Sequence, residues 1–230
     1  MALPVLNDTP KYTMKLPSTG KTIKYRPYLV KEEKILLMAN ETKDPNQMMN
    51  AIGDTIEACT SNKVKSNDLT TFDLEYIFLK IRSKSVGEEV KLNMPCESCE
   101  ERTETSINLD EVVCPVDKPQ TIIEIDDKVS VELKWPSYAD ITASEDVSDT
   151  AINLLISCIR AVISDDERID IQDEPREQII NFLESMTSSQ FQKLSEFVSN
   201  VPSVKHDIVF DCEHCGHHNT IEVKGMQSFF

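Results

Sequence analysis

The sequence contains little glycine, with five residues in 230. Loops that cradle phosphate groups depend on closely spaced glycines, and neither GxxxxGK[ST] nor GxGxxG is present. The HExxH motif of zinc proteases and the GxSxG motif of hydrolases are also missing. The four histidines leave few groups for acid–base chemistry, since three of them lie together near the C-terminus. These absences predict a protein that is not an enzyme and has no small-molecule substrate.

Long apolar runs are missing as well. No segment approaches the roughly 18 to 20 uninterrupted apolar residues that a membrane span needs. The first eight residues lack a basic region followed by an apolar stretch, so we expect no secretory signal. Without an export signal, seven cysteines, an odd number, are typical of a reducing compartment in which thiolates bind metal. The sequence therefore predicts a cytoplasmic protein with no membrane contact.

Positive charge is scarce. Lys and Arg together number 24 against 40 Asp and Glu, which gives a formal net charge of −16. Nucleic-acid affinity depends on cations that neutralise phosphates, so we expect no direct binding of DNA or RNA. A negative surface instead favours contact with basic protein surfaces.

The N-terminal residues 1–87 are predicted to form a hairpin followed by helices. Residues 11–26 alternate as strands do, around a turn-forming Pro-Ser-Thr-Gly segment. Helical periodicity begins near Leu29, and Asp44 before Pro45 is typical of the start of a second helix. A third helix is expected after Thr70.

The rest of the chain is predicted to alternate between hairpins and helices. Strands are expected on both sides of residues 95–99, within 120–135 and on both sides of 212–215. We expect a zinc-ribbon-like β part at 88–136 and 204–224, an inserted helical block at 137–203 and a tail at 225–230. The fold class is α+β: β-hairpins that include a split four-cysteine zinc ribbon, with N-terminal and inserted helical blocks.

Four cysteines form two CxxC pairs, Cys96/Cys99 and Cys212/Cys215. Each pair lies at a predicted strand-to-strand turn, where the spacing lets both sulfurs reach one ion. Two such turns supply the closed four-cysteine geometry of structural zinc, so we predict one zinc bound by these side chains. Gly216 suits the left-handed backbone that often follows such a turn. The 112 residues between Cys99 and Cys212 would then be an insertion into the ribbon.

Other interpretations of the CxxC pairs remain open at this stage. A redox dithiol usually opens a helix after a strand, which these turns do not. The two pairs could also lie in unrelated loops. Three histidines crowd the second turn, and one of them could replace a cysteine or contact a ligand from outside: His214, His217 and His218.

Several other segments have ordinary explanations. Cys59 and Cys158 are expected to be buried on helix faces, and Cys114 to lie in a loop, where a role as a spare ligand is disfavoured. The acidic residues 165–174 do not match a calcium-binding loop, so we expect a solvated connection there. Within 151–163 the periodicity predicts a helix.

The chain resembles a known family in three features. These are YTMKLPSTGKTIKYRPYLVKEEKILL at residues 12–37, the two CxxC turns separated by helices, and a short tail that ends in Phe229-Phe230. In these features the chain is similar to the T-even-type bacteriophage baseplate proteins, a family of hub subunits and hub assembly proteins. The resemblance implies a non-catalytic protein that binds other baseplate hub or tail proteins. It also implies a location in the host cytoplasm during assembly and leaves two alternatives open: the protein stays in the virion tail baseplate, or it acts only during assembly.

A competing interpretation is a zinc-ribbon regulator of transcription or replication. Such a ribbon should bring a basic patch, but residues 88–111 contain far more acidic than basic side chains. Two apolar segments at the ends of the chain are either docking segments that order on binding or ordinary frayed termini: Leu3, Val5 and Leu6 at one end, and Phe229 and Phe230 at the other.

Overall fold

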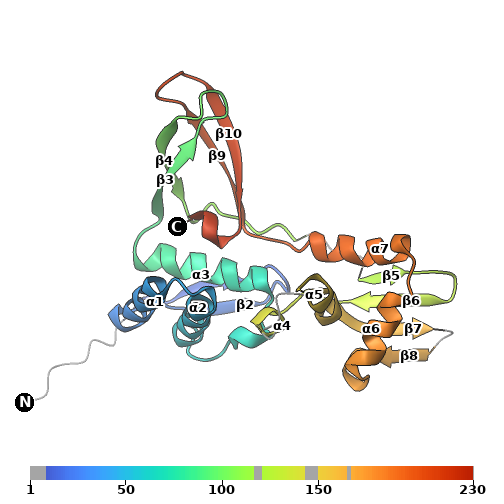
Figure 1. The fold of residues 1–230 in the computed structure, drawn as a ribbon. Coiled ribbons are helices and arrows are strands. Elements are labelled where there is room, and N and C mark those ends of the chain that lie inside the picture. Colours follow the sequence, from blue (N-terminus) through green and yellow to red (C-terminus); the bar gives the residue numbers. More distant parts are fainter. Residues whose placement is uncertain (1–8, 117–120, 143–149, 165–166, 230) are drawn as a thin grey trace, which may run out of the picture. The chain divides into compact units, whose positions relative to one another are not determined.

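The computed structural model describes residues 9–116, 121–142, 150–164 and 167–229. The chain forms two compact units: unit 1 contains Met1–Val116 and Pro202–Phe230, and unit 2 contains Asp117–Val201. Helices and antiparallel strands occur in both units (Figure 1), which confirms the predicted α+β class. The predicted segments at Leu3, Val5 and Leu6 and at Phe230 lie outside the described residues.

Unit 1 begins with the predicted hairpin and three helices. Their bounds are β1 (Tyr12–Lys15), β2 (Thr22–Tyr25), α1 (Val30–Thr42), α2 (Pro45–Cys59) and α3 (Thr71–Ser85). As predicted, Asp44 caps α2, since its carboxylate accepts a hydrogen bond from the Asn46 N–H at 2.9 Å. The core of this part consists of side chains with no solvent exposure, mainly from α2 and α3: Ile52, Ile56, Phe72, Leu74, Ile77, Leu79 and Ile81.

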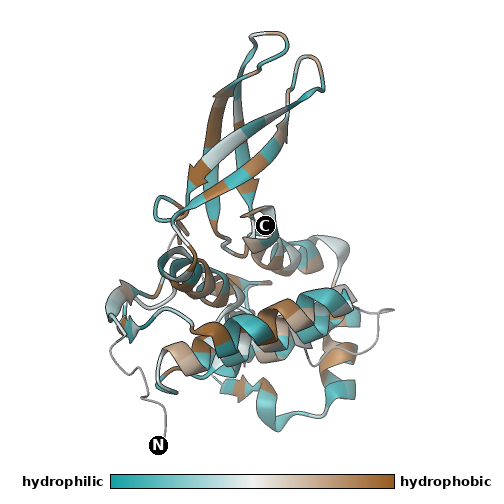
Figure 2. Ribbon diagram, turned by 90° about the vertical axis from the view of Figure 1, so that its left-hand side faces the viewer, coloured by the Kyte–Doolittle hydropathy of each residue, from teal (hydrophilic) through white to brown (hydrophobic). Residues whose placement is uncertain are grey.

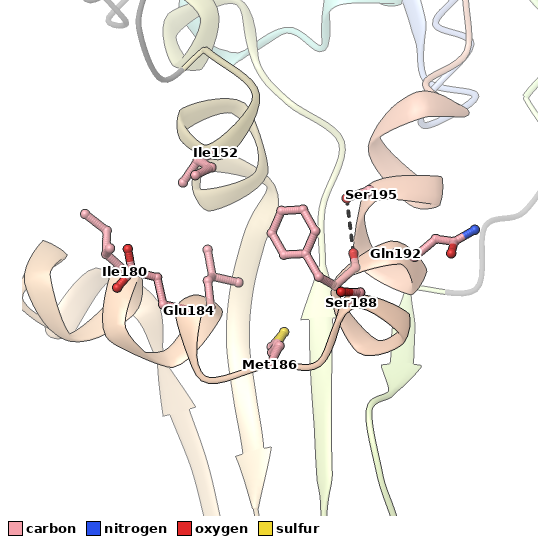
Figure 3. A pocket seen from close by; sticks show the side chains of 9 residues that line it. Ile152, Ile180, Glu184, Met186, Ser188, Gln192 and Ser195 are labelled. Atoms are coloured by element: carbon pink, nitrogen blue, oxygen red, sulfur yellow. Dashed lines mark hydrogen bonds between the residues drawn. The ribbon is translucent and has the colours of Figure 1, made fainter.

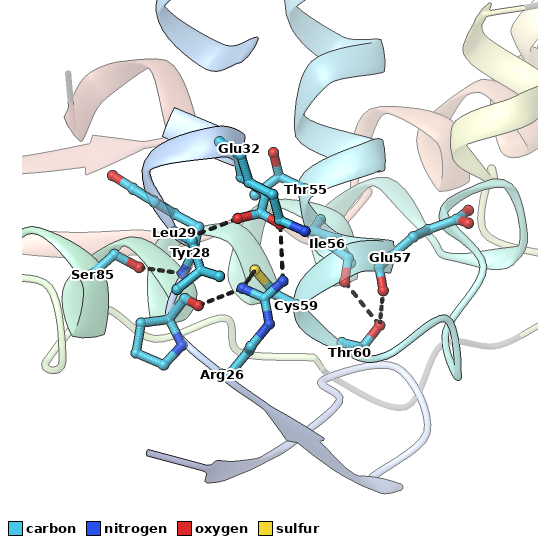
Figure 4. Close-up of polar contacts among 12 residues, drawn as sticks. Arg26, Tyr28, Leu29, Glu32, Thr55, Ile56, Glu57, Cys59, Thr60 and Ser85 are labelled. Carbon is cyan, nitrogen blue, oxygen red and sulfur yellow. Dashed lines mark hydrogen bonds and ion pairs between the residues drawn. The ribbon is translucent and has the colours of Figure 1, made fainter. Parts of the chain in front are cut away.

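A buried ion pair joins the hairpin to the start of α1 (Figure 4). The Arg26 guanidinium donates to the Glu32 carboxylate at 2.9 Å, and the Leu29 N–H donates to the same carboxylate at 2.8 Å. Burial raises the pKa of Glu32, but these donors outweigh it, and the pKa is lowered. The contacts fix the direction in which the chain leaves the hairpin.

Two further hairpins complete unit 1. The first pairs β3 (Glu89–Pro95) with β4 (Arg102–Asn108), and the second pairs β9 (Lys205–Asp211) with β10 (His218–Lys224). They lie side by side with their turns at the same end (Figures 1 and 2). Buried and exposed side chains alternate along each strand, so each hairpin turns one face toward the other.

Helix α3 holds the bases of both hairpins. Lys80 donates to the carbonyl of Asp110 at 2.8 Å, and the Asp110 carboxylate accepts from Lys84 at 2.6 Å, just after β4. On the other side, the Glu75 carboxylate accepts from the backbone N–H groups of Val204 and Met226, although burial is the largest influence on Glu75 and raises its pKa. Both hairpins are therefore attached to the same helix.

The C-terminal tail is packed into unit 1 as far as Phe229, which corrects the prediction that Phe229 lies in a docking segment or a frayed end. Met226–Phe229 form the 3-10 helix η4, and the Phe229 side chain is 0% exposed. The turn before η4 requires Gly225, whose φ is +73°. Because its side chain is buried, Phe229 cannot act as a free docking segment in this conformation.

The described residues of unit 2 form a four-stranded antiparallel sheet, four α-helices and the short 3-10 helix η3 (Ile171–Asp173). The sheet order is β5 (Ile122–Glu124), β6 (Val129–Leu133), β7 (Ile159–Ser164) and β8 (Glu167–Asp170). The helices are α4 (Tyr138–Thr142), α5 (Thr150–Cys158), α6 (Arg176–Glu184) and α7 (Ser188–Ser199). One apolar cluster joins sheet and helices, and Trp135 stacks on Phe197 with ring centroids 4.4 Å apart.

Unit 2 differs from the prediction in three places. The helix expected over 151–163 ends at Cys158, because the β-branched residues that follow pair with β6 as strand β7. Part of the expected acidic connection is the edge strand β8. The hairpin at 120–135 belongs to unit 2 and not to the ribbon part, because β6 pairs with β7 and contributes Val131 and Leu133 to the core of unit 2.

Candidate metal centre

The first CxxC turn is closed by two backbone hydrogen bonds. The Cys96 N–H donates to the Glu101 carbonyl at 2.9 Å, and the Glu100 N–H donates to the Cys96 carbonyl at 3.0 Å. Glu100 has a φ of +62°, which is left-handed backbone that a non-glycine residue rarely adopts. This turn places the Cys96 and Cys99 side chains on the same side of the hairpin end.

The second CxxC turn repeats this pattern. The Cys212 N–H donates to the His217 carbonyl at 2.9 Å, and the Gly216 N–H donates to the Cys212 carbonyl at 2.9 Å. Gly216 has the predicted left-handed backbone, with a φ of +71°. Gly216 therefore occupies the position that Glu100 occupies in the first turn.

The four sulfurs of the two turns converge. All four Sγ atoms lie within 4.8 Å of one another; Cys96 and Cys215 are 3.7 Å apart, and Cys99 and Cys212 are 3.6 Å apart. Tetrahedral Zn–S bonds of about 2.3 Å place sulfurs about 3.8 Å from each other. The donor set and its spacing therefore fit one tetrahedral ion.

Backbone and side-chain donors surround the Cys96 sulfur. The Ser98 N–H lies 3.4 Å from it, and the Cys99 N–H and the Asn219 side chain also donate. Burial raises the pKa of Cys96, but these donors outweigh it, and the pKa is lowered. Such donors stabilise a thiolate, which is the form that binds metal.

The Cys212 sulfur has a matching environment. The N–H groups of Cys215 and His214 and the hydroxyl of Thr103, 3.8 Å away, donate to it. Led by the Cys215 N–H, these donors lower the pKa of Cys212 to about 6. The first cysteine of each turn therefore has a lowered pKa, which favours its thiolate form.

Cys99 shows the opposite tendency. The Glu101 N–H lowers its pKa, but burial and the neighbouring sulfurs outweigh that donor and raise the pKa to about 12. Four thiolates this close together repel one another, so protons remain on some of them unless a cation balances the charge. A divalent ion is the kind of cation that this arrangement can hold.

Two buried polar residues, Thr103 and Asn219, connect the hairpins reciprocally. Thr103 of the first hairpin is 3% exposed and accepts a hydrogen bond from the Glu213 N–H of the second turn at 3.3 Å. Asn219 of the second hairpin is 0% exposed and accepts from the Glu97 N–H of the first turn at 2.9 Å. Each hairpin thus provides a buried side chain that accepts a hydrogen bond from the turn of the other hairpin.

The reciprocity follows from a repeat in the sequence. Thr103 lies seven residues after Cys96, and Asn219 lies seven residues after Cys212. The short sulfur pairs also relate the first cysteine of each turn to the second cysteine of the other. The two hairpins are therefore related by an approximate two-fold axis. Thr103 and Asn219 were not predicted from the sequence, although their equal spacing from Cys96 and Cys212 places them at equivalent positions.

The histidines near the second turn are not part of the group of four sulfurs among the described residues. His217 uses its backbone carbonyl to close the turn, and the exposed His218 ring lies 2.7 Å from the Asp211 carboxylate. Cys59 and Cys158 are buried on their helices, as predicted. Cys114 is partly buried, and burial raises its pKa to about 12.

Unit 2 has an apolar hollow of about 470 Å³ among α5, α6 and α7 (Figure 3). Among the described residues that line it, Glu184 is the only ionisable side chain. Ser195 donates its hydroxyl proton to the Phe191 carbonyl at 3.1 Å.

Residues 9–230 match the family described as T4 bacteriophage base plate protein. The chain belongs to this family. The match extends over both units and includes all four clustered cysteines. Neither a curated protein nor a solved structure matches the chain significantly.

Membership in the T4 baseplate family confirms the resemblance drawn from residues 12–37 and indicates a structural role in the phage. It also implies association with other phage baseplate proteins and a place in the virion tail. Within the part of the chain that the structure describes, no helix is both long enough and apolar enough to cross a bilayer.

Proposed function

We propose that this T4 baseplate family member is a non-enzymatic structural or assembly protein of the baseplate hub, which binds other hub proteins and contains one structural zinc. The observation that supports the zinc is the convergence of the Cys96, Cys99, Cys212 and Cys215 sulfurs. Family membership supports the role in the baseplate.

Zinc suits this donor set for three reasons. Four cysteine sulfurs are its usual structural ligands, the sulfur spacing fits a tetrahedral ion, and amide and hydroxyl donors offset the negative charge of the thiolates. When bound, the ion would supply four strong bonds between two hairpins that are far apart in the sequence. A closed site has no open position for a substrate, so its role is to stabilise the ribbon.

The charges of the ribbon support a protein partner over a nucleic acid. Lys91 pairs with Glu104 at 2.8 Å, and Lys205 and Lys224 both pair with Glu222, at 3.1 and 2.8 Å. These cations are already neutralised by carboxylates on the same hairpins. A ribbon that bound nucleic acid would need free cations on its face, so the regulator interpretation is disfavoured.

Metal analysis and co-purification test the proposal together. We expect about one zinc per chain in protein purified without added metal. Tagged protein from infected cells should recover hub proteins, and the amount in mature tails should separate a virion component from an assembly factor. Zinc-free protein with intact stability would overturn the metal assignment, and recovery of polymerase without tail proteins would overturn the hub role.

A further inference from the structure

We propose that a lysine-lined hollow on unit 1 binds an acidic segment of a partner protein, and that this segment contains at least one large apolar side chain. This lysine hollow consists of two adjoining cavities between hairpin β1–β2 and the chain that follows α2. The inference rests on the proposed function, since it names the surface that meets another baseplate protein.

The lysine hollow has a polar rim and an apolar floor. Its larger cavity has a volume of about 560 Å³ and its smaller one about 90 Å³, and Lys24 and Lys63 line both. The rim of the larger cavity also includes Lys21 and Lys65. Four apolar side chains line the same cavity, and all except Val64 are buried: Leu16, Ile23, Val64 and Leu69.

Positive charge is concentrated here in a chain whose net charge is −16. Residues 11–26 contain four lysines and one arginine but no Asp or Glu. Within the described residues, Lys65 pairs with Glu57 at 3.0 Å, and Asp68 is the one acidic residue that lines either cavity. The structure shows no ion pair within the described residues for four exposed lysines of the hollow: Lys11, Lys21, Lys24 and Lys63.

The hairpin presents its lysines in a fixed arrangement. Met14 and Ile23 are opposite each other in the register and are 8% and 7% exposed, so they hold one face of the hairpin against unit 1. The exposed Lys21 and Lys24 lie just before and within strand β2, so the hairpin fixes the spacing of their backbone positions. A charged surface that is already ordered loses less entropy when it binds a partner.

The loop that supplies Lys63 has unusual backbone. Ser61 and Asn62 are consecutive non-glycine residues with φ values of +58° and +56°. The Asn62 N–H donates to the Glu57 carbonyl at 2.8 Å, which holds this conformation at the end of α2. Left-handed backbone at non-glycine residues has a cost in stability and is concentrated at functional positions. Here it brings Lys63 to the cavities that Lys24 also lines.

An acidic protein segment fits these features better than a nucleic acid does. Free lysines would pair with Asp or Glu, and the floor at Leu16, Val64 and Leu69 would receive an apolar side chain, which a phosphate backbone does not have. A long polyanion would also meet the repulsion of the acidic remainder of the chain. A short segment that enters only the lysine hollow avoids that repulsion.

Carbodiimide cross-linking of tail assemblies from infected cells tests the proposal directly. The reagent joins a lysine amine to an adjacent carboxylate as an amide, with loss of water. We expect mass spectrometry to find Lys24 or Lys63 joined to Asp or Glu of another baseplate protein, close to a large apolar residue. Assemblies that contain the protein but never show either lysine joined to a second protein would overturn the assignment.

Charge-reversal variants distinguish a contact at the lysine hollow from an effect of the net charge of the protein. Lys24→Glu and Lys63→Glu should each reduce recovery of the partner with tagged protein, measured without cross-linker, about tenfold, because attraction becomes repulsion. Lys128→Glu is the matched control, since Lys128 is exposed in unit 2 and its reversal changes the net charge equally. Circular dichroism and metal content should be unchanged in all three variants.

The remaining outcomes distinguish failure of the lysine hollow as a binding surface from failure of the hub role. Equal recovery from wild type and hollow variants, or equal loss in all three variants, would overturn the lysine hollow as the binding surface but not the hub role, because the wild type still recovers hub proteins. If the wild type recovers no tail protein, the proposed function fails, and this inference fails with it. Saturable binding of a DNA duplex of about 20 base pairs that Lys24→Glu abolishes would show a nucleic-acid surface instead.

Discussion

Different interactions stabilise the ribbon of unit 1 and the core of unit 2. Between the two hairpins, the contacts nearest the turns are four sulfurs and the buried polar residues Thr103 and Asn219. In unit 2, a continuous apolar cluster joins the sheet to α5, α6 and α7. Near the turns, hydrogen bonds and the proposed metal would therefore orient the two hairpins, whereas unit 2 depends on packing.

Loss of a sulfur should have the largest effect and should be confined to the ribbon. Cys96→Ser or Cys212→Ser should release the metal and remove most of the metal-dependent stability, because structural zinc binding supplies on the order of 10 kcal/mol. Metal analysis, together with thermal unfolding with and without a chelator, measures both effects. Cys114→Ser is the matched control, and loss of metal from that variant would contradict the four-sulfur assignment.

Truncation in the core of unit 2 should have the complementary effect. Leu194 is 0% exposed within the apolar cluster, so Leu194→Ala should destabilise unit 2 by about 2–5 kcal/mol through lost burial and a cavity. The zinc content should not change. Hydrogen exchange can follow each unit separately, and a loss of protection in the ribbon of the same size would show that the units are not independent.

The polar residues between the hairpins should have an intermediate effect. Thr103→Val and Asn219→Ala each remove a donor to a cysteine sulfur and an acceptor for the opposite turn. We expect metal affinity to fall by roughly 10- to 100-fold, in line with other contacts to metal ligands. Competition with a chromogenic chelator measures this. Because of the approximate two-fold axis the two variants should behave alike, and a large difference would argue against it.

The two left-handed turn positions should give the smallest effects, with opposite signs. Glu100→Gly removes backbone strain and should raise ribbon stability by up to about 1 kcal/mol, whereas Gly216→Ala should lower it by about 1 kcal/mol. No atom lies within 4 Å of a Cβ built on Gly216, so the loss would come from backbone conformation alone. Chemical denaturation of the zinc-loaded protein distinguishes the signs, and a stabilising Gly216→Ala would exclude this explanation.

Local patterns predicted unit 1 well. Alternation around a turn predicted β1 and β2, and Asp44 with Pro45 predicted the start of α2. These features are set by residues close together in the chain. The same reasoning failed at Ile159, where an apolar run suits a helix or a buried strand equally and pairing with β6 makes it a strand.

Phe229 and the hairpin at 120–135 show a second kind of failure. From the sequence alone, nothing indicates which other segments pack against an aromatic residue near a chain end or against a hairpin next to the ribbon. Phe229 is buried within unit 1, and β6 joins a sheet whose other strands come later in the chain. Burial and sheet membership depend on what folds against a segment, which local pattern does not contain.

The sequence by itself determined the composition of the candidate metal centre: two CxxC turns, a glycine where the second turn needs left-handed backbone, and an acidic chain of the baseplate family. Only the tertiary structure showed that the sulfurs of the two turns lie together and that Thr103 and Asn219 connect the turns. It also showed that Lys24 of the hairpin and Lys63 of the loop after α2 line the same two adjoining cavities. The reason is physical. Turn chemistry is local, whereas a shared site depends on distances between segments that sequence separation does not specify.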